Sequence, residues 1–203
     1  MFKIAVLASG SGSNLQSIID NIENENLNCK IEMVIGSKEG IYALERAKSA
    51  GIKTFVVSKK DYGKNTSDEV LKLVDGKVDL IVLAGYLSIL DGEILKKFKN
   101  KIINIHPSLI PSFCGPNMYG IKVHEAAIEK GVKISGCTVH FVNDEVDGGA
   151  IILQKAVEVL FEDDASSLQK RILKEEHKLL PEAIKYLIED KVSVVNGRVR
   201  ILK

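Results

Sequence analysis

Short apolar runs rich in β-branched residues alternate along the first half of the chain with segments in which apolar residues recur at helical spacing. The predicted strands cover residues 2–7, 30–36, 52–57, 79–85 and 101–106, and the predicted helices cover 13–26, 41–50, 65–75 and 91–98. Such alternation is typical of a parallel sheet with helices on both faces. We therefore expect an α/β fold built on an open, mostly parallel, twisted sheet.

The pattern changes after residue 120. Two apolar runs, at 133–142 and 149–159, flank an acidic loop with two glycines and predict antiparallel strands added to the sheet in the C-terminal third. Leucine and isoleucine at helical spacing predict a helix over 165–188. Asn196-Gly197 between two β-branched runs predicts a terminal hairpin.

We find no internal repeat, low-complexity tract or linker, so we expect residues 1–203 to form a single domain. The 28 basic and 27 acidic side chains nearly cancel, which argues against a nucleic-acid partner. No apolar run is long enough for a signal peptide or a membrane span. Cys29, Cys114 and Cys137 are scattered, which argues against a disulfide framework and a zinc site. The composition predicts a cytoplasmic protein that acts on small molecules without a metal.

The first glycine-rich segment, "ASGSGSNLQ" at residues 8–16, connects a predicted strand to a predicted helix. Its glycines permit a tight turn, and Ser13 and Asn14 could cap a helix whose N–H groups favour a phosphate. The segment lacks both the Gly-Lys-Ser/Thr ending of a Walker loop and the third glycine of a dinucleotide fingerprint. A phosphate site and a plain strand-to-helix turn both remain open.

The segment "IINIHPSLIP" places Asn104 and His106 at the end of a predicted strand, with Pro107 holding His106 in an extended conformation. Strand alternation puts both side chains on one face. An amide beside an imidazolium could stabilise an oxyanion, and the imidazolium could give a proton to a leaving amine. The alternative is that His106 only satisfies a local carbonyl.

The acidic loop "NDEVDGGAIIL" contributes a third polar candidate. Asp144 and Glu145 are typical of a solvated turn, whereas Asp147 precedes Gly148-Gly149 and an apolar strand, so we expect it to be partly buried. A carboxylate beside His106 would raise the pKa of that imidazole. Of the other histidines, we expect His124 and His177 to be surface or packing residues on helices and His140 to lie in a strand, where it could contact the site.

The sequence lacks the motifs of enzymes that use a cysteine or serine nucleophile or a bound metal ion. Cys114 lies in a Pro/Gly-rich loop without an obvious base, and the sequence contains no GxSxG elbow, HExxH motif or acidic cluster at metal spacing.

Four segments together resemble the phosphoribosylglycinamide formyltransferase family, one of the folate-dependent formyltransferases: "GSGSNL", "VLAGYLSIL", "NIHPSLIPSF" and "TVHFVNDEVDGGAIILQ". The resemblance runs from Ile4 to about Pro181. It implies formyl transfer from 10-formyltetrahydrofolate, as co-substrate, to the amine of glycinamide ribonucleotide in purine synthesis. It also implies a ribotide-binding half of about 1–100 and a folate-binding, catalytic half of about 101–203, in a monomer or homodimer.

The resemblance also implies roles for individual residues. The catalytic trio would be Asn104, His106 and Asp147, with Asp147 holding His106 charged. The ribotide contacts would be Gly12, Ser13, Asn14 and Glu176. The folate contacts would be Leu87, Ser88, Ile89, Leu90, Asn104, Asn143, Asp144, Glu145, Val146, Asp147 and, as the nearest basic counterpart, Lys64.

The sequence departs from many relatives at Ser88, where they carry arginine, and at Leu173, where they carry glutamine. The loop "CGPNMYG" is longer than in some relatives and could be a flap or an ordered surface loop. Two relatives of this fold, formyltetrahydrofolate hydrolase and methionyl-tRNA formyltransferase, usually carry an extra domain. A strand that begins at residue 2 and a hairpin near Lys203 lead us to expect neither. A phosphate-binding module without catalysis is a further alternative, although the whole polar trio is present.

Overall fold

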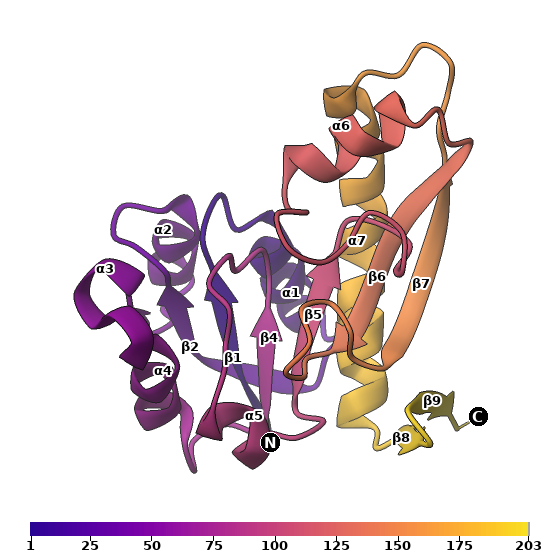
Figure 1. The fold of residues 1–203 in the computed structure, drawn as a ribbon. Helices are drawn as coiled ribbons and strands as arrows, with labels where there is room; N and C mark the ends of the chain where they lie inside the picture. The colour runs from indigo at the N-terminus through magenta and orange to yellow at the C-terminus, as the bar shows by residue number, and fades with distance from the viewer. Residues whose placement is uncertain (203) are drawn as a thin grey trace. The chain divides into compact units, whose positions relative to one another are not determined.

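The computed structural model describes residues 1–202, and in that range strands follow one another in a seven-stranded sheet in the order β3-β2-β1-β4-β5-β6-β7. Contacts divide the chain into two compact units, one of Met1–Asn104 and one that begins at Ile105. The predicted fold class is confirmed: the sheet is mostly parallel, antiparallel pairing occurs in the C-terminal part, and helices surround it. Figure 1 shows the elements of each unit.

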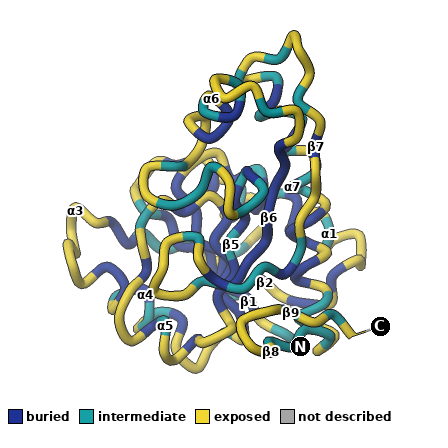
Figure 2. Tube along the Cα trace, turned by 45° about the vertical axis from the view of Figure 1, so that its right-hand side comes forward, coloured by how far each residue is buried: buried dark blue, intermediate teal, exposed yellow. Residues whose placement is uncertain are grey.

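The first unit is a parallel α/β arrangement. Its elements are β1 (Phe2–Ala8), α1 (Ser13–Glu23), β2 (Cys29–Gly36), α2 (Tyr42–Ser49), β3 (Thr54–Val56), α3 (Lys59–Tyr62), the 3-10 helix η1 (Gly63–Asn65), α4 (Thr66–Val74), β4 (Leu80–Leu83), α5 (Glu93–Lys97) and the start of β5 (Ile102–His106). β1 pairs in parallel with β2 and β4, and β4 pairs in parallel with β5. Residues Ile4 to Ala8 have no solvent exposure, as expected for a strand covered on both faces. Figure 2 colours the Cα trace by the burial of each residue.

The second unit contains α6 (Ile121–Glu129), β6 (Ile134–Phe141), β7 (Ile151–Glu158), α7 (Ala165–Ile188), β8 (Val192–Val195) and β9 (Arg198–Ile201). β6 and β7 form the predicted antiparallel pair, with a register shift between Val139 and His140. β8 and β9 form the predicted hairpin, which is a separate two-stranded sheet. The long helix α7 packs against β6, β7 and α6 (Figure 1).

The differences from the predicted elements lie at their ends and in one connection. α1 ends at Glu23 and not at residue 26, and β3 is confined to Thr54–Val56. The structure adds α3 and η1 before α4, where no helix was predicted. Neither α3 nor η1 contains a buried residue, so the hydrophobic pattern gives no signal for them. No helix within residues 1–202 is long and apolar enough to cross a membrane.

Candidate functional site

Asp147 occupies the loop between β6 and β7, and its backbone has a φ of 57°, in the left-handed region. Its side chain is only 10% exposed, so the expected partial burial is confirmed. The Gly115 N–H donates to Oδ2 at 2.9 Å. Burial raises the pKa of the Asp147 carboxyl, but the contact with His140, the Gly115 N–H and the nearby imidazoles outweigh it and hold that pKa below its ordinary value. The loop therefore presents an ionised carboxylate to the second unit's interior.

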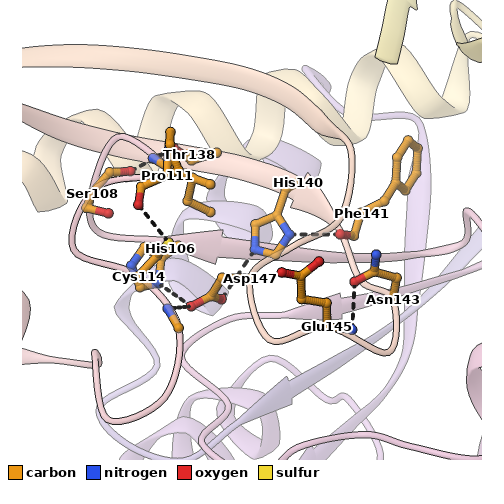
Figure 3. Close-up of polar contacts among 12 residues, drawn as sticks. His106, Ser108, Pro111, Cys114, Thr138, His140, Phe141, Asn143, Glu145 and Asp147 are labelled. Carbon is orange, nitrogen blue, oxygen red and sulfur yellow. Dashed lines mark hydrogen bonds and ion pairs between the residues drawn. The ribbon is translucent and has the colours of Figure 1, made fainter. Parts of the chain in front are cut away.

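His106, at the end of β5, contacts two acceptors with its two ring nitrogens, and Figure 3 shows its contact with Asp147. Nε2 lies 2.9 Å from the carbonyl oxygen of Phe113, and Nδ1 lies 3.6 Å from Oδ2 of Asp147. The imidazole therefore satisfies a local carbonyl and also contacts the predicted carboxylate, while its catalytic role stays a prediction. The division between the compact units falls directly after Asn104, so the shared face of Asn104 and His106 stays a prediction.

The protonation of His106 differs from the expectation. Burial lowers the pKa of this imidazole, and it outweighs the Phe113 carbonyl and the Asp147 charge, which both raise it, while His140 lowers it further. The influence of Asp147 has the predicted direction, but the net shift of the pKa is downward. The resting form of His106 is therefore the neutral imidazole at neutral pH.

His140 is the third side chain at the carboxylate. It lies on β6, is 2% exposed, and places Nε2 3.6 Å from Oδ1 of Asp147 (Figure 3). Its Nδ1 lies 2.8 Å from the carbonyl oxygen of Phe141. Its strand position was predicted, and the structure shows the contact that the sequence left open. Asp147 thus has one buried imidazole at each carboxylate oxygen.

The segment after His106 is fixed by side-chain hydrogen bonds. The Thr138 hydroxyl donates to the Ser108 carbonyl at 2.7 Å and accepts from the Ile110 N–H at 3.1 Å and from the Gln154 amide at 3.0 Å. The Ser108 hydroxyl donates to the Ser112 carbonyl at 2.6 Å. These bonds orient the loop that carries the Phe113 carbonyl onto His106. Thr138 and Gln154 were not among the predicted site residues, because their role depends on β6 and β7 meeting the loop.

Cys114 lies in the same loop, where its thiol donates to the Pro111 carbonyl at 3.2 Å. Burial raises the pKa of this thiol, and the charges of Asp147 and Glu145 raise it further. A thiolate is therefore disfavoured, which supports the prediction that Cys114 is not a nucleophile. The part of the chain that the structure describes contains no group of three His, Cys, Asp or Glu side chains suited to a metal ion.

The glycine-rich segment of the first unit turns at Gly12, which has a φ of 71° and is the N-cap of α1. The expected capping by Ser13 and Asn14 is wrong: α1 has no side-chain cap bond, and these residues form its first turn. The backbone also runs close to α2, since a Cβ on Gly12 would lie 2.7 Å from Cα of Ala43. Arg46, which the sequence did not single out, donates from Nε to the Ser11 carbonyl at 2.9 Å. The backbone at the start of α1 is therefore held in place by α2, with Gly12 and Asn14 buried and Ser13 half-buried.

A second segment of the first unit meets this turn. The Ser9 hydroxyl accepts from the Leu87 N–H at 2.9 Å, and the Ser9 N–H donates to the Gly85 carbonyl at 3.0 Å. Leu87 and Ile89 are 58% and 68% exposed, whereas Leu90 is buried. The first loop and the segment after β4 therefore lie side by side within this unit.

The remaining candidates lie as follows. Ser88 is half-buried, and Lys64 is exposed on η1. In the loop of Asp147, the side chains of Asn143, Asp144, Glu145 and Val146 are exposed, and Asn143 accepts from the Glu145 N–H at 3.1 Å. Glu176 is 7% exposed on α7. No ligand contact is assigned to any of these residues by the structure alone.

Residues 2–184 match the formyl transferase family model. The chain belongs to the formyl transferase family. The resemblance that the sequence motifs predicted is thereby confirmed over nearly the whole chain.

Individual relatives agree with the family. The chain is 44% identical over 195 residues to the phosphoribosylglycinamide formyltransferase of Haemophilus influenzae, covering 95% of this chain and 90% of that protein. It is 42% identical over 197 residues to the trifunctional purine biosynthetic protein adenosine-3 of Gallus gallus, covering 95% of this chain. The chain spans only 19% of the length of that trifunctional relative.

Solved structures of this family share the fold. Glycinamide ribonucleotide transformylase 1 from Symbiobacterium toebii matches with a TM-score of 0.94 and 41% identity, covering 100% of this chain and 95% of that one. A formyltetrahydrofolate deformylase from Pseudomonas syringae also matches, with a TM-score of 0.90 and 26% identity, covering 100% of this chain and 66% of that one. The fold therefore occurs in both a transferase and a deformylase. Fold similarity alone does not distinguish formyl transfer to a second substrate from hydrolysis of the formyl folate.

Proposed function

We propose that this formyl transferase transfers the formyl group of 10-formyltetrahydrofolate to the amine of N1-(5-phospho-D-ribosyl)glycinamide, a step of purine (IMP) biosynthesis. The observation that carries the proposal is the match to the Haemophilus influenzae phosphoribosylglycinamide formyltransferase, which the chain covers almost end to end. The buried His106–Asp147 pair supplies the acid–base chemistry that such a transfer needs. We further propose a cytoplasmic monomer or homodimer with small-molecule substrates.

The reaction forms one bond, breaks one bond and moves one proton. The amine nitrogen bonds to the formyl carbon, the bond from that carbon to the folate nitrogen breaks, and the proton lost by the amine ends on the folate nitrogen. No acyl-enzyme is needed, so holding the two substrates together supplies much of the rate. We assign the amide of Asn104 and the charged form of His106 to the developing oxyanion.

The neutral resting state of His106 refines the role first expected of Asp147. A neutral imidazole can accept the proton that the attacking amine loses, directly or through water. The ionised carboxylate 3.6 Å away then stabilises the imidazolium until its proton passes to the leaving nitrogen. In this proposal Asp147 supports the charged form during turnover and does not hold His106 charged at rest.

Each unit supplies proposed substrate contacts. We assign the ribotide phosphate to the N-terminus of α1 at Gly12, Ser13 and Asn14, because the N–H groups and dipole at a helix N-terminus favour an anion. We assign the folate to two sets of exposed or half-buried side chains that offer apolar and polar contacts. These are Leu87, Ser88 and Ile89 with the backbone at Leu90, and Asn143, Asp144, Glu145 and Val146. Glu176 and Lys64 remain proposed contacts to the ribotide and the folate, respectively.

The rival activity is hydrolysis of 10-formyltetrahydrofolate, which the likeness to the Pseudomonas syringae deformylase supports. An assay of tetrahydrofolate release with and without glycinamide ribonucleotide separates the two. We expect release only with the ribotide, together with an equal amount of formylated ribotide. Release at the same rate without the ribotide would assign the deformylase activity, and binding of either ligand without turnover would assign a binding module.

A further inference from the structure

The loop from Ser108 to Gly115 contacts both members of the proposed catalytic pair through its backbone. The Phe113 carbonyl lies 2.9 Å from Nε2 of His106, and the Gly115 N–H donates to Oδ2 of Asp147 at 2.9 Å. Burial lowers the pKa of His106, which the Phe113 carbonyl opposes. Burial raises the pKa of Asp147, which the Gly115 N–H opposes. Both backbone groups therefore favour an imidazolium beside a carboxylate, the charged pair of the proposed turnover.

Side chains of β6 and β7 hold the start of this loop. The Thr138 hydroxyl donates to the Ser108 carbonyl at 2.7 Å and accepts from the Ile110 N–H at 3.1 Å. In Figure 3, Thr138 lies beside Ser108. Gln154 is the partner of Thr138 in the β6–β7 register, and its amide donates to the same hydroxyl and to the Ile110 carbonyl, both at 3.0 Å. Two side chains thus bind three backbone groups of the loop.

The Thr138 hydroxyl uses its whole hydrogen-bonding capacity in these contacts. A hydroxyl has one hydrogen and two lone pairs, and those of Thr138 are taken by two backbone groups of the loop and the Gln154 amide. Thr138 is fully buried, so water has no access to replace these bonds. The loop continues through the Ser108 hydroxyl, which donates at 2.6 Å to the carbonyl of Ser112, the residue before Phe113. The anchor on β6 and the carbonyl beside the imidazole therefore belong to one connected network.

We propose that Thr138 is a positioning residue of the transfer reaction: it fixes the loop whose backbone contacts His106 and Asp147. Gln154 supports it through their shared hydrogen bond. This inference rests on the proposed function. Without the hydroxyl, the start of the loop loses two backbone bonds and can move away from both members of the pair. Turnover should then fall although neither Thr138 nor Gln154 touches a substrate in this role.

The kinetic test compares Thr138→Val, which removes the hydroxyl at nearly constant volume, with Thr138→Ser, which keeps it. In Thr138→Val we expect kcat to fall by roughly 10- to 100-fold with little change in either KM, because a displaced reacting group slows the transfer more than it weakens binding. Thr138→Ser should recover most of the wild-type kcat. Lys155→Gln, an exposed substitution on β7, is the control and should have the wild-type kcat.

The structural test is the titration of His106 by ring-nitrogen NMR in the full chain without substrate. In Thr138→Val the His106 midpoint should fall by about one pH unit, because the Phe113 carbonyl no longer supports the charged ring. Asp147, His140 and His124, whose charges interact with that of His106, are unchanged in these variants. Thr138→Ser and Lys155→Gln should keep the wild-type midpoint. A loss of stability alone would not move the midpoint of the folded state.

An unmoved His106 midpoint in folded Thr138→Val would overturn the inference, as would a Thr138→Ser variant as impaired as Thr138→Val. If Thr138→Val does not fold, Gln154→Leu decides, because it removes two bonds from an exposed position of β7 and should lower the same midpoint. An unmoved midpoint in Gln154→Leu would then overturn the inference. The NMR readouts need no ribotide. A chain that shows the midpoint shift but forms no formylated ribotide as wild type would overturn the proposed function alone.

Discussion

Asp147 concentrates several interactions in one side chain. Its two oxygens meet His106, His140 and the Gly115 N–H, and its backbone adopts a φ of 57° that aspartate tolerates better than most residues. The sequence indicated the partial burial, because Asp147 precedes two glycines and an apolar strand. The contact with His106, some forty residues away, could only be inferred through the family resemblance, since it depends on how the loop returns to β5.

Replacing Asp147 should reduce turnover and shift its pH dependence. Asp147→Asn should lower kcat by roughly 10²- to 10⁴-fold, the usual contribution of acid–base groups. The Asp147 charge raises the pKa of His106, so its removal lowers that pKa, and the acid limb of kcat/KM should move to lower pH. Glu129→Gln, an exposed substitution at the end of α6, should have the wild-type profile. An Asp147→Asn profile at the wild-type position would remove Asp147 from this role.

Gly12 combines a special backbone conformation with a close approach. Its φ of 71° disfavours any side chain, and a Cβ would lie 2.7 Å from both Cα and Cβ of Ala43. We expect Gly12→Ala to lower the free energy of unfolding by about 2 kcal/mol or more. Urea denaturation measures this, with Gly10→Ala as the matched control, because nothing lies within 4 Å of a Cβ at Gly10. If the two variants had equal free energies of unfolding, α2 would be able to move away from the added methyl group without loss of stability.

The elements of the fold were predicted best where burial is periodic. The mostly buried β1 and the amphipathic α7 were identified from pattern alone, as was the antiparallel pair β6–β7. The connection through α3 and η1 was missed because it buries nothing. The start of α1 was placed correctly, but its capping was not. The N-cap is Gly12 in the left-handed conformation, which has no side chain to cap the helix, and the residue types alone did not reveal this.

An ion pair at the junction between β7 and α7 should make the stability of the protein depend on pH. Asp163 accepts two hydrogen bonds from Arg171, both 2.6 Å long, and one from Ser167, beside a capping box made by Asp164 and Ser167. Arg171 holds the pKa of the Asp163 carboxyl well below its ordinary value, although burial opposes it. The stabilisation is therefore fully present above the unfolded pKa of about 4 and is lost as the pH falls through the lower folded pKa.

Asp163→Asn should lower the free energy of unfolding by about 1 kcal/mol at pH 6, a value that allows for solvent screening of the pair. The difference from the wild type should shrink as the pH falls below about 4. Urea unfolding at a series of pH values measures both effects. Glu162→Gln, an adjacent exposed acid without these bonds, should show neither. A difference between Asp163→Asn and the wild type that does not change with pH would assign the stabilisation to packing and not to charge.

The whole molecule consists of two compact units, and the sequence predicted the family from motifs spread over both of them. The single-domain expectation stays a prediction, because motifs and periodicity do not report how strongly two units are coupled. The near balance of charge gives no field that would favour one macromolecular partner. In the proposed function, specificity comes from local groups, namely the N-terminus of α1 in the first unit and the loop of Asp147 in the second.

If the two units bind different substrates, a substitution in either unit should raise the KM of one substrate and not of the other. Ser13→Ala should raise the KM for the ribotide by roughly tenfold, the value of one hydrogen bond to a charged group, and leave the KM for the folate nearly unchanged. Val146→Ser should raise the KM for the folate by a similar factor through lost apolar contact, and not that for the ribotide. Initial rates with each substrate varied measure both values, with Ser49→Ala as an exposed control on α2. Because the two changes act on different ligands, the double variant should show both increases, each of the same size as in the single variant. A Ser13→Ala variant that raised both KM values equally would show that the first loop positions the whole site and not the phosphate alone.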